Sequence, residues 1–161
     1  VEMAEVKPTL LRDAINPLRN RYDFIIIDTP PALGNLSYNS LVTSDYVVVT
    51  CEPSIYGLQG LSALNRTIKD VQNRQNKNLK VIGILLVKYN SRTILNRDIK
   101  DMIEDYSKLM DSAVFSTKIR EGVVVREAQT VRKPLVDYGK NSKPNIDYEA
   151  FTCELLERIK G

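Results

Sequence analysis

The chain has 161 residues, of which 43% are hydrophobic and 27% are charged, and its formal net charge is +3. This length suits one domain with an ordinary core, and no apolar run approaches the roughly 20 residues of a membrane-spanning helix. The sequence contains no histidine, which excludes a Ser-His-Asp triad, histidine acid–base catalysis and histidine-ligated zinc or iron.

Hydrophobic periodicity predicts helices and strands in alternation. A helix is predicted at 9–19, with Thr9 as N-cap and Pro17 limiting its end. The later elements are, in order, a strand at 24–28, a helix at 36–42, a strand at 45–51, a helix at 57–76, a strand at 80–89, a helix at 93–110, a strand at 114–119, a short helix within 122–130, an edge strand at 135–138 and a helix capped by Asp147. This alternation favours an α/β fold with a mostly parallel sheet and helices on both faces.

The segment Tyr22–Gly34 is the most informative part of the sequence. Three isoleucines, Ile25–Ile27, lead to Asp28, and the chain then turns through Thr29-Pro30-Pro31. An acid at the carboxyl end of a buried parallel strand lies at the edge where open α/β sheets bind ligands. The pattern is typical of a Walker B strand, whose aspartate holds the water shell of a nucleotide-bound Mg²⁺ and whose following loop senses the γ-phosphate.

No phosphate-binding loop accompanies this strand. Only Gly139 precedes a lysine, and Asn141 follows where Ser or Thr would be required. A central strand also needs neighbours on both sides, yet only one helix precedes this one. We therefore expect residues 1–161 to form the C-terminal part of a single larger nucleotide-binding domain, incomplete in its fold and prone to self-association through an open sheet edge.

Positive charge is concentrated in one part of the chain. Residues 77–143 contain 14 Lys and Arg against 8 Asp and Glu, which predicts either a surface that faces a polyanion or an ordinary solvated basic face. Cys51 and Cys153 are far apart and form no Cys-x-x-Cys pair, so we expect a reduced, cytosolic compartment.

Four motifs occur in the same order and spacing as in a known family: Tyr22–Gly34, Cys51–Leu61, Gly83–Thr93 and Val125–Gln129, the last followed by Lys133-Pro-Leu. On these motifs the chain resembles the ParA-type chromosome and plasmid partition ATPases, within the MinD/ParA group of P-loop proteins. The resemblance covers nearly the whole chain. It implies an ATPase that dimerises around Mg-ATP, binds non-specific DNA and releases it on hydrolysis stimulated by a ParB-type partner.

The resemblance also assigns site residues. Asp28 would be the Walker B aspartate and hold Mg²⁺ indirectly, through water. The switch would be Thr29, Pro30, Pro31 and Gly34. The other implied residues are, for the dimer interface, Glu52 and Pro53; for the nucleotide base, Lys88, Tyr89, Ile119, Arg120 and Glu121; and for DNA, Arg92, Arg97, Lys100, Arg126, Arg132 and Lys133. Arg120 stands where many relatives have proline.

Without the phosphate-binding loop and its lysine, we expect this chain to bind no Mg-ATP by itself and to hydrolyse none. The predicted setting is the cytoplasm, at the nucleoid, with no membrane partner. The alternatives are a MinD-like membrane-cycling ATPase, which needs a basic amphipathic C-terminal helix, and a non-catalytic module that binds DNA or caps a full-length partner. An iron–sulfur carrier is disfavoured by the absence of paired cysteines.

Overall fold

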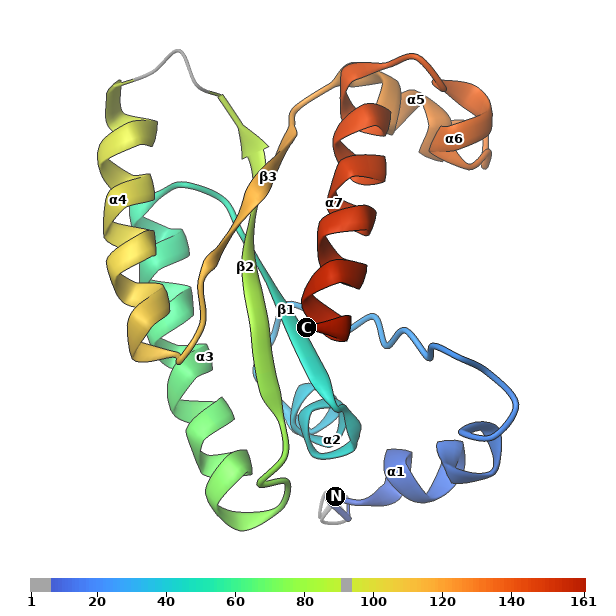
Figure 1. The fold of residues 1–161 in the computed structure, drawn as a ribbon, viewed down its shortest axis with the longest axis vertical. Helices are drawn as coiled ribbons and strands as arrows, with labels where there is room; N and C mark the ends of the chain where they lie inside the picture. Colours follow the sequence, from blue (N-terminus) through green and yellow to red (C-terminus); the bar gives the residue numbers. More distant parts are fainter. Residues whose placement is uncertain (1–6, 91–93) are drawn as a thin grey trace, which may run out of the picture. The chain divides into compact units, whose positions relative to one another are not determined.

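The computed structural model describes residues 7–90 and 94–161, in which helices and strands alternate (Figure 1). The strands are β1 (Tyr46–Cys51), β2 (Lys80–Tyr89) and β3 (Val114–Arg120). The helices are α1 (Leu10–Ile15), α2 (Asn35–Thr43), α3 (Ile55–Arg74), α4 (Ile94–Leu109), α5 (Val123–Thr130), α6 (Leu135–Tyr138) and α7 (Lys143–Lys160), with a 3₁₀ turn η1 (Asn16–Leu18) after α1. The bounds of most elements agree with the sequence prediction to within a few residues.

The three strands form one sheet in the order β1-β2-β3. β2 and β3 run parallel, with Ile84 opposite Val114 and Tyr89 opposite Arg120. Because parallel neighbours need a crossover connection, α4 links the two strands. Figure 1 shows α4 and α7 on opposite faces of β2 and β3. The predicted α/β class, a parallel sheet covered by helices on both faces, is confirmed.

The chain divides into two compact units. The first unit comprises the residues up to Val47 together with Ser62–Lys80, and the second unit comprises Val48–Leu61 and Val81–Gly161. The predicted switch segment and α2 therefore belong to the first unit. The carboxyl ends of the three strands, with α5, α6 and α7, belong to the second unit.

The core of the second unit forms where α7 packs against the sheet. Leu85, Phe115 and Ile119 are buried there, and Phe151 and Leu155 of α7 pack against them. The rings of Phe115 and Phe151 meet edge to face, with centroids 5.0 Å apart. Burial of each large apolar side chain contributes about 1.5–3 kcal/mol, so this contact fixes α7 on the sheet.

Polar side chains of α7 complete the hydrogen bonding of β3, whose register against β2 shifts at two places. The backbone N–H groups of Ser116 and Thr117 each donate to the carboxylate of Glu154 at 2.8 Å. One turn later, the Arg158 guanidinium donates to Glu154 at 2.9 Å and to the carbonyl of Val114 at 3.0 Å. The irregularity of β3 is therefore matched by donors and acceptors from the helix.

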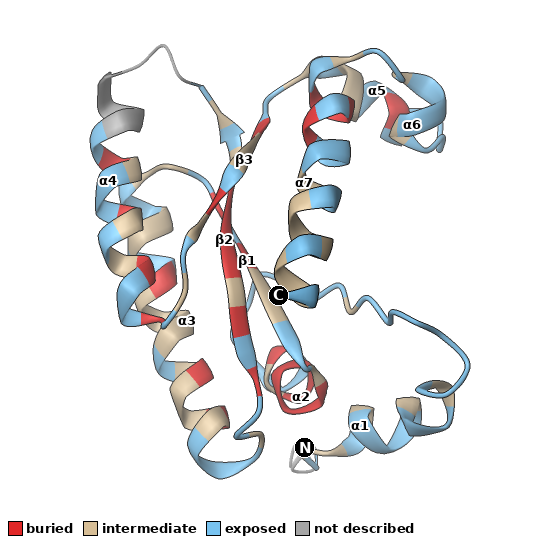
Figure 2. Cartoon of the chain, in the orientation of Figure 1, coloured by how far each residue is buried: buried red, intermediate tan, exposed pale blue. Residues whose placement is uncertain are grey.

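Figure 2 shows that helix α2 of the first unit is largely buried. Most of its residues are nevertheless polar. Ser40 Oγ donates to the carbonyl of Leu36 and Thr43 Oγ1 to that of Asn39, at 2.8 and 2.7 Å. The carbonyl of Thr43, at the end of the helix, accepts a 2.9 Å hydrogen bond from Arg19 Nη2. The hydroxyls are thus satisfied locally, which allows a polar helix to be buried without an unpaired group.

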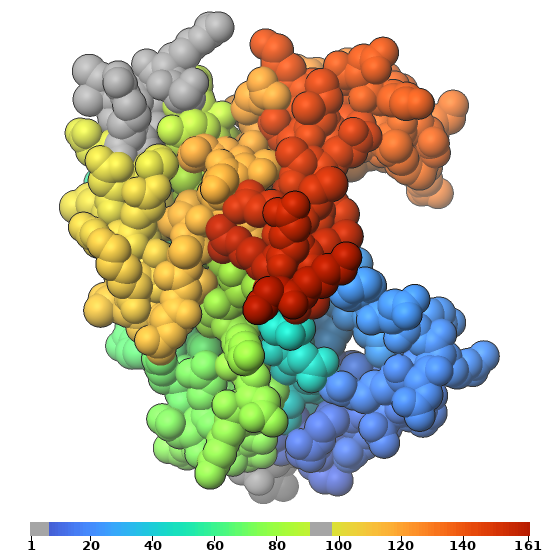
Figure 3. Space-filling view, viewed as in Figure 1, coloured from blue at the N-terminus to red at the C-terminus, as the bar shows by residue number. Residues whose placement is uncertain are grey.

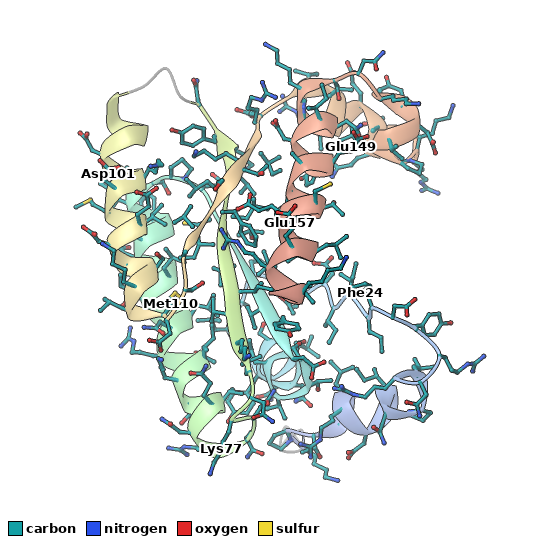
Figure 4. The ribbon with its side chains drawn as sticks, viewed as in Figure 1. Phe24, Lys77, Asp101, Met110, Glu149 and Glu157 are labelled. Atoms are coloured by element: carbon teal, nitrogen blue, oxygen red, sulfur yellow. The ribbon has the colours of Figure 1, made fainter. Side chains whose placement is uncertain are left out.

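The predicted strand Phe24–Asp28 is not a strand in this structure. None of the described strands pairs with it, and its apolar side chains face solvent: Phe24 is 58% and Ile26 is 93% exposed. Figure 4 labels Phe24 on the extended segment between η1 and α2. Composition favours an extended backbone here, but a strand also requires a neighbour to accept its hydrogen bonds.

Two C-terminal predictions are also wrong. The predicted edge strand at 135–138 is the short helix α6. The carbonyl of Pro134 accepts hydrogen bonds from the N–H groups of Asp137 and Tyr138, at 3.1 and 3.0 Å, and these bonds close a helical turn. The last helix does not start at Asp147 but four residues earlier, where Ser142 Oγ caps it by accepting from Asn145 N. Asp147 is therefore inside the helix and free to contact β3.

Candidate functional site

The predicted Walker B and switch residues, Asp28 and Thr29–Gly34, form an exposed extended segment of the first unit. The first turn of α2 anchors this segment, because Ser37 Oγ donates to the carbonyls of Ala32 at 2.6 Å and Pro30 at 3.4 Å. A Cβ at Gly34 would meet nothing within 4 Å, so this backbone conformation does not itself require glycine. The segment is attached at its α2 end and accessible along its length.

The carboxylate of Asp28 is exposed, and no hydrogen bond or ion pair to it occurs among residues 7–90 and 94–161. The described part of the chain also has no group of three or more Cys, Asp or Glu side chains that could hold a metal ion. Mg²⁺ in nucleotide sites keeps several waters and takes one or two carboxylates together with substrate phosphates. A single accessible aspartate fits that use, with Mg²⁺ held through water and the nucleotide supplying the phosphates.

In the second unit, Glu52 and Lys88 form an ion pair at the carboxyl ends of β1 and β2. Lys88 has φ of 50°, a left-handed conformation that is uncommon outside glycine, and the β2–β3 register shifts between Leu86 and Tyr89. Such bulges redirect a side chain, and they are frequent beside functional sites. The bulge therefore places the ammonium group of Lys88 on Glu52.

The electrostatic surroundings of Lys88 include groups from two further elements. The hydrogen bond and charge of Glu52 raise the pKa of Lys88, the charge of Glu121 after β3 adds to this, and the charge of Arg126 on α5 opposes it. Three of the residues predicted at the sheet edge (Glu52, Lys88 and Glu121) thus lie within electrostatic reach of one another. The geometry brings together these parts of the predicted interface and nucleotide edge.

The loop after β1 is tightly built. Ser54 Oγ accepts a 3.0 Å hydrogen bond from Gly57 N and so caps α3, while Pro53 is half-buried. A Cβ at Gly57 would lie 2.3 Å from the carbonyl oxygen of Glu52, so a larger residue would displace the loop. Ile55 and Tyr56 project from this turn, 64% and 84% exposed.

The other predicted base-binding residues have different surroundings. The ammonium of Lys118 lies 5.4 Å from the centre of the Tyr89 ring, and Ile119 is 3% exposed in the core. The Arg120 guanidinium binds Asp147 of α7, with Nη2–Oδ1 at 2.6 Å and Nε–Oδ2 at 2.8 Å. The side chain and the backbone N–H of Arg120 are thus both bound to Asp147, and they fasten α7 to β3.

Sequence analysis missed the function of Asp147. Burial tends to raise the pKa of this carboxyl, but hydrogen bonds from the side chain and backbone N–H of Arg120 outweigh it and hold the pKa below its ordinary value. The detectable signal was the spacing of Asp147, Glu154 and Arg158, which repeats at helical intervals on one face. All three contact β3.

The predicted DNA residues separate into three groups. Arg92 and the side chain of Arg97 lie outside the described residues. Lys100 is half-buried and paired with Glu104 in α4. The remaining three are exposed: Arg126, Arg132 and Lys133. They belong to α5 and the turn after it, a part of the second unit that is orange in Figure 3. No ion pair to them occurs in the described part of the chain.

Comparison with known families identifies the chain. The model of the AAA_31 family, an AAA domain, matches residues 1–81, just over half of the sequence. The chain belongs to this family. Its relatives include proteins of the ParA type, and the resemblance to ParA-type P-loop ATPases is thereby confirmed.

Two curated relatives and one solved structure illustrate the match to this AAA_31 chain. The chromosome partitioning protein ParA of Myxococcus xanthus is 37% identical over 92% of the chain and 51% of its own length. The sporulation initiation inhibitor protein Soj of Bacillus subtilis is 36% identical over 86% of the chain and 56% of its own length. The chain spans about half the length of these relatives.

The solved structure is cobyrinic acid a,c-diamide synthase from Mycobacterium smegmatis with a bound ATP analogue and magnesium. It is 30% identical, with a TM-score of 0.79 over 99% of the chain and 57% of that protein.

In the AAA_31 chain itself, none of the described helices is long and apolar enough to cross a membrane.

Proposed function

We propose that this chain carries the switch, base-binding edge and DNA surface of a ParA-type partition ATPase that works with Mg-ATP. The observation that carries the proposal is the accessible, unpaired carboxylate of Asp28 at the start of a segment anchored on α2. When bound, Mg²⁺ neutralises charge on the transferring phosphoryl group. Asp28 would hold its water shell, and Thr29–Gly34 would respond to the γ-phosphate.

The second unit contains the residues proposed for the nucleotide base and the dimer interface. Lys88 and Tyr89 lie at the carboxyl end of β2, which is the side of an α/β sheet that binds ligands. Glu52 and Pro53 would face a second copy of the protein across the nucleotide, with Glu52 held in place by Lys88. The partners are non-specific DNA of the nucleoid, a ParB-type activator and the second copy itself.

The structure of α7 bears on the membrane-cycling alternative. A helix that binds a bilayer must present its apolar face to the lipid. In α7 this face is engaged, since Phe151 and Leu155 pack against the core of the second unit. We therefore favour DNA over a membrane as the surface on which the protein acts.

Hydrolysis tests the proposal. We expect the full-length protein to hydrolyse ATP in the presence of Mg²⁺ and the 161-residue chain alone to show neither turnover nor tight nucleotide binding, because the chain has no phosphate-binding loop. The measurements are a phosphate-release assay and a nucleotide titration by calorimetry. Turnover by the 161-residue chain would contradict the proposed division of the active site.

DNA binding provides a second test, with salt dependence as the readout. Because each phosphate contact contributes about 0.9 to the slope of log K against log salt, replacing Arg126, Arg132 and Lys133 together by alanine should reduce the slope by about 2 to 3, and Arg92→Ala by about 1. Lys100→Ala is the control and should leave the slope unchanged, because the ammonium group of Lys100 is already paired with Glu104. Binding that is equally salt-sensitive in the triple variant would remove these residues from the interface.

A further inference from the structure

A pocket of about 420 Å³ in the first unit borders the proposed switch segment but includes neither Asp28 nor any residue proposed for the base or for DNA. One wall comes from the start of α2 and the residues before it, including Leu33, Gly34 and Tyr38. The other wall comes from α3 and includes Arg66 and Asp70. The pocket is thus formed where the end of the switch segment meets α3.

The two walls are joined by a hydrogen-bonded link. Tyr38 Oη donates to Asp70 Oδ2 at 3.2 Å, and Asp70 Oδ1 accepts from Arg74 Nε at 2.6 Å. Burial, followed by the hydrogen bond and charge of Asp70, raises the pKa of Tyr38, which therefore remains a protonated donor. Arg74 compensates the negative charge of Asp70, so this carboxylate adds little net charge to the pocket.

The uncompensated charge of the pocket is positive. Arg66 is exposed, and no ion pair to it occurs within residues 7–90 and 94–161. Arg66 lies one helical turn before Asp70, but Asp70 pairs with Arg74, which lies one turn after it. The N-terminal end of α2 carries the partial positive charge of the helix dipole. No acidic residue in its first turn offsets this charge, which has the same sign as that of Arg66.

An apolar side chain completes the wall beside Arg66. Leu33 lines the pocket and is 48% exposed. An occupant that pairs a carboxylate with an adjacent apolar side chain would satisfy both features at once. A polyanion suits the pocket less well, because a chain of phosphates has no apolar group to cover Leu33.

We propose that this pocket is a docking site for an acidic segment of a protein partner, whose carboxylate pairs with Arg66 and whose apolar neighbour covers Leu33. Apart from Leu33 and Gly34 at the end of the switch segment, none of its lining residues is assigned to nucleotide or DNA. Gly34 lines it, and Ser37 ties the same turn to the carbonyl of Ala32. Occupancy would therefore restrain the switch segment, a consequence that rests on the proposed function.

The test is a titration of the 161-residue chain, without nucleotide, followed by amide NMR. The probes are two blocked tetrapeptides, acetyl-Ala-Leu-Glu-Leu-amide and its glutamine counterpart. We expect the glutamate peptide to shift the amide signals of Gly34 and Thr67 and to bind about three- to fivefold more tightly than the glutamine peptide, as for an exposed ion pair. Arg66→Gln should abolish this preference.

Arg12→Gln is the matched control, because it removes an exposed arginine from α1 of the same unit and should leave the preference unchanged. Equal binding of the two peptides, shifts confined to other amides, or tighter binding of a lysine peptide would overturn the proposal. Stronger shifts of the same amides by a short DNA oligonucleotide, or by self-association without peptide, would do so too. Because the titration contains no nucleotide, its failure would leave the proposed ATPase function standing.

Discussion

Replacing Glu154 by alanine is expected to lower the free energy of unfolding by about 2–3 kcal/mol. The Glu154 carboxylate accepts the N–H groups of Ser116 and Thr117, each at 2.8 Å, and its side chain is only 18% exposed. Alanine would leave both donors of β3 without an acceptor and would free the guanidinium of Arg158. Glutamine retains one carbonyl acceptor and should cost about half as much. Urea denaturation followed by circular dichroism measures both effects.

The control is Glu157→Ala, which removes an exposed carboxylate from the same helix and should change stability little. Acid gives an independent readout. Burial tends to raise the pKa of Glu154, but hydrogen bonds from the N–H groups of Thr117 and Ser116 outweigh it, so the folded-state pKa is lowered. Its contribution is therefore complete above the ordinary glutamate pKa and disappears as the pH falls through the lower folded value. An unchanged acid transition in Glu154→Ala would contradict this account.

The sequence predicted most elements because their patterns depend on local periodicity. The strand at 80–89 and the helices around it follow from apolar runs and spacing, and the structure contains them as β2, α3 and α4. The segment Phe24–Asp28 differs, since its composition is that of a strand but the hydrogen-bonding neighbour is not among the described strands. Pairing is a property of the whole sheet, and no local pattern reports it.

The candidate site was predictable in its residue types but not in its contacts. The acid of Asp28 and the turn after it could be read from the sequence, as could the positions of Glu52 and Lys88 after neighbouring strands. Their ion pair depends on a bulge and a left-handed backbone at Lys88, which a lysine in an apolar run does not signal. The attachment of Arg120 to Asp147 joins residues 27 positions apart and required the fold.

In the full-length protein, Asp28→Asn is expected to reduce Mg-ATP hydrolysis by about 100-fold or more, because an amide cannot organise the Mg²⁺ water shell as a carboxylate does. Stability should not change, since the Asp28 side chain is exposed and no contact to it occurs among the described residues. Asp23→Asn is the matched control, an exposed aspartate in the same segment that should retain full activity. The measurements are phosphate release over a range of Mg²⁺ concentrations and a thermal melt of each variant. If Asp28→Asn keeps wild-type turnover, or if Asp23→Asn loses as much, then Asp28 is not the residue that holds the metal water and the proposed switch segment has been placed wrongly.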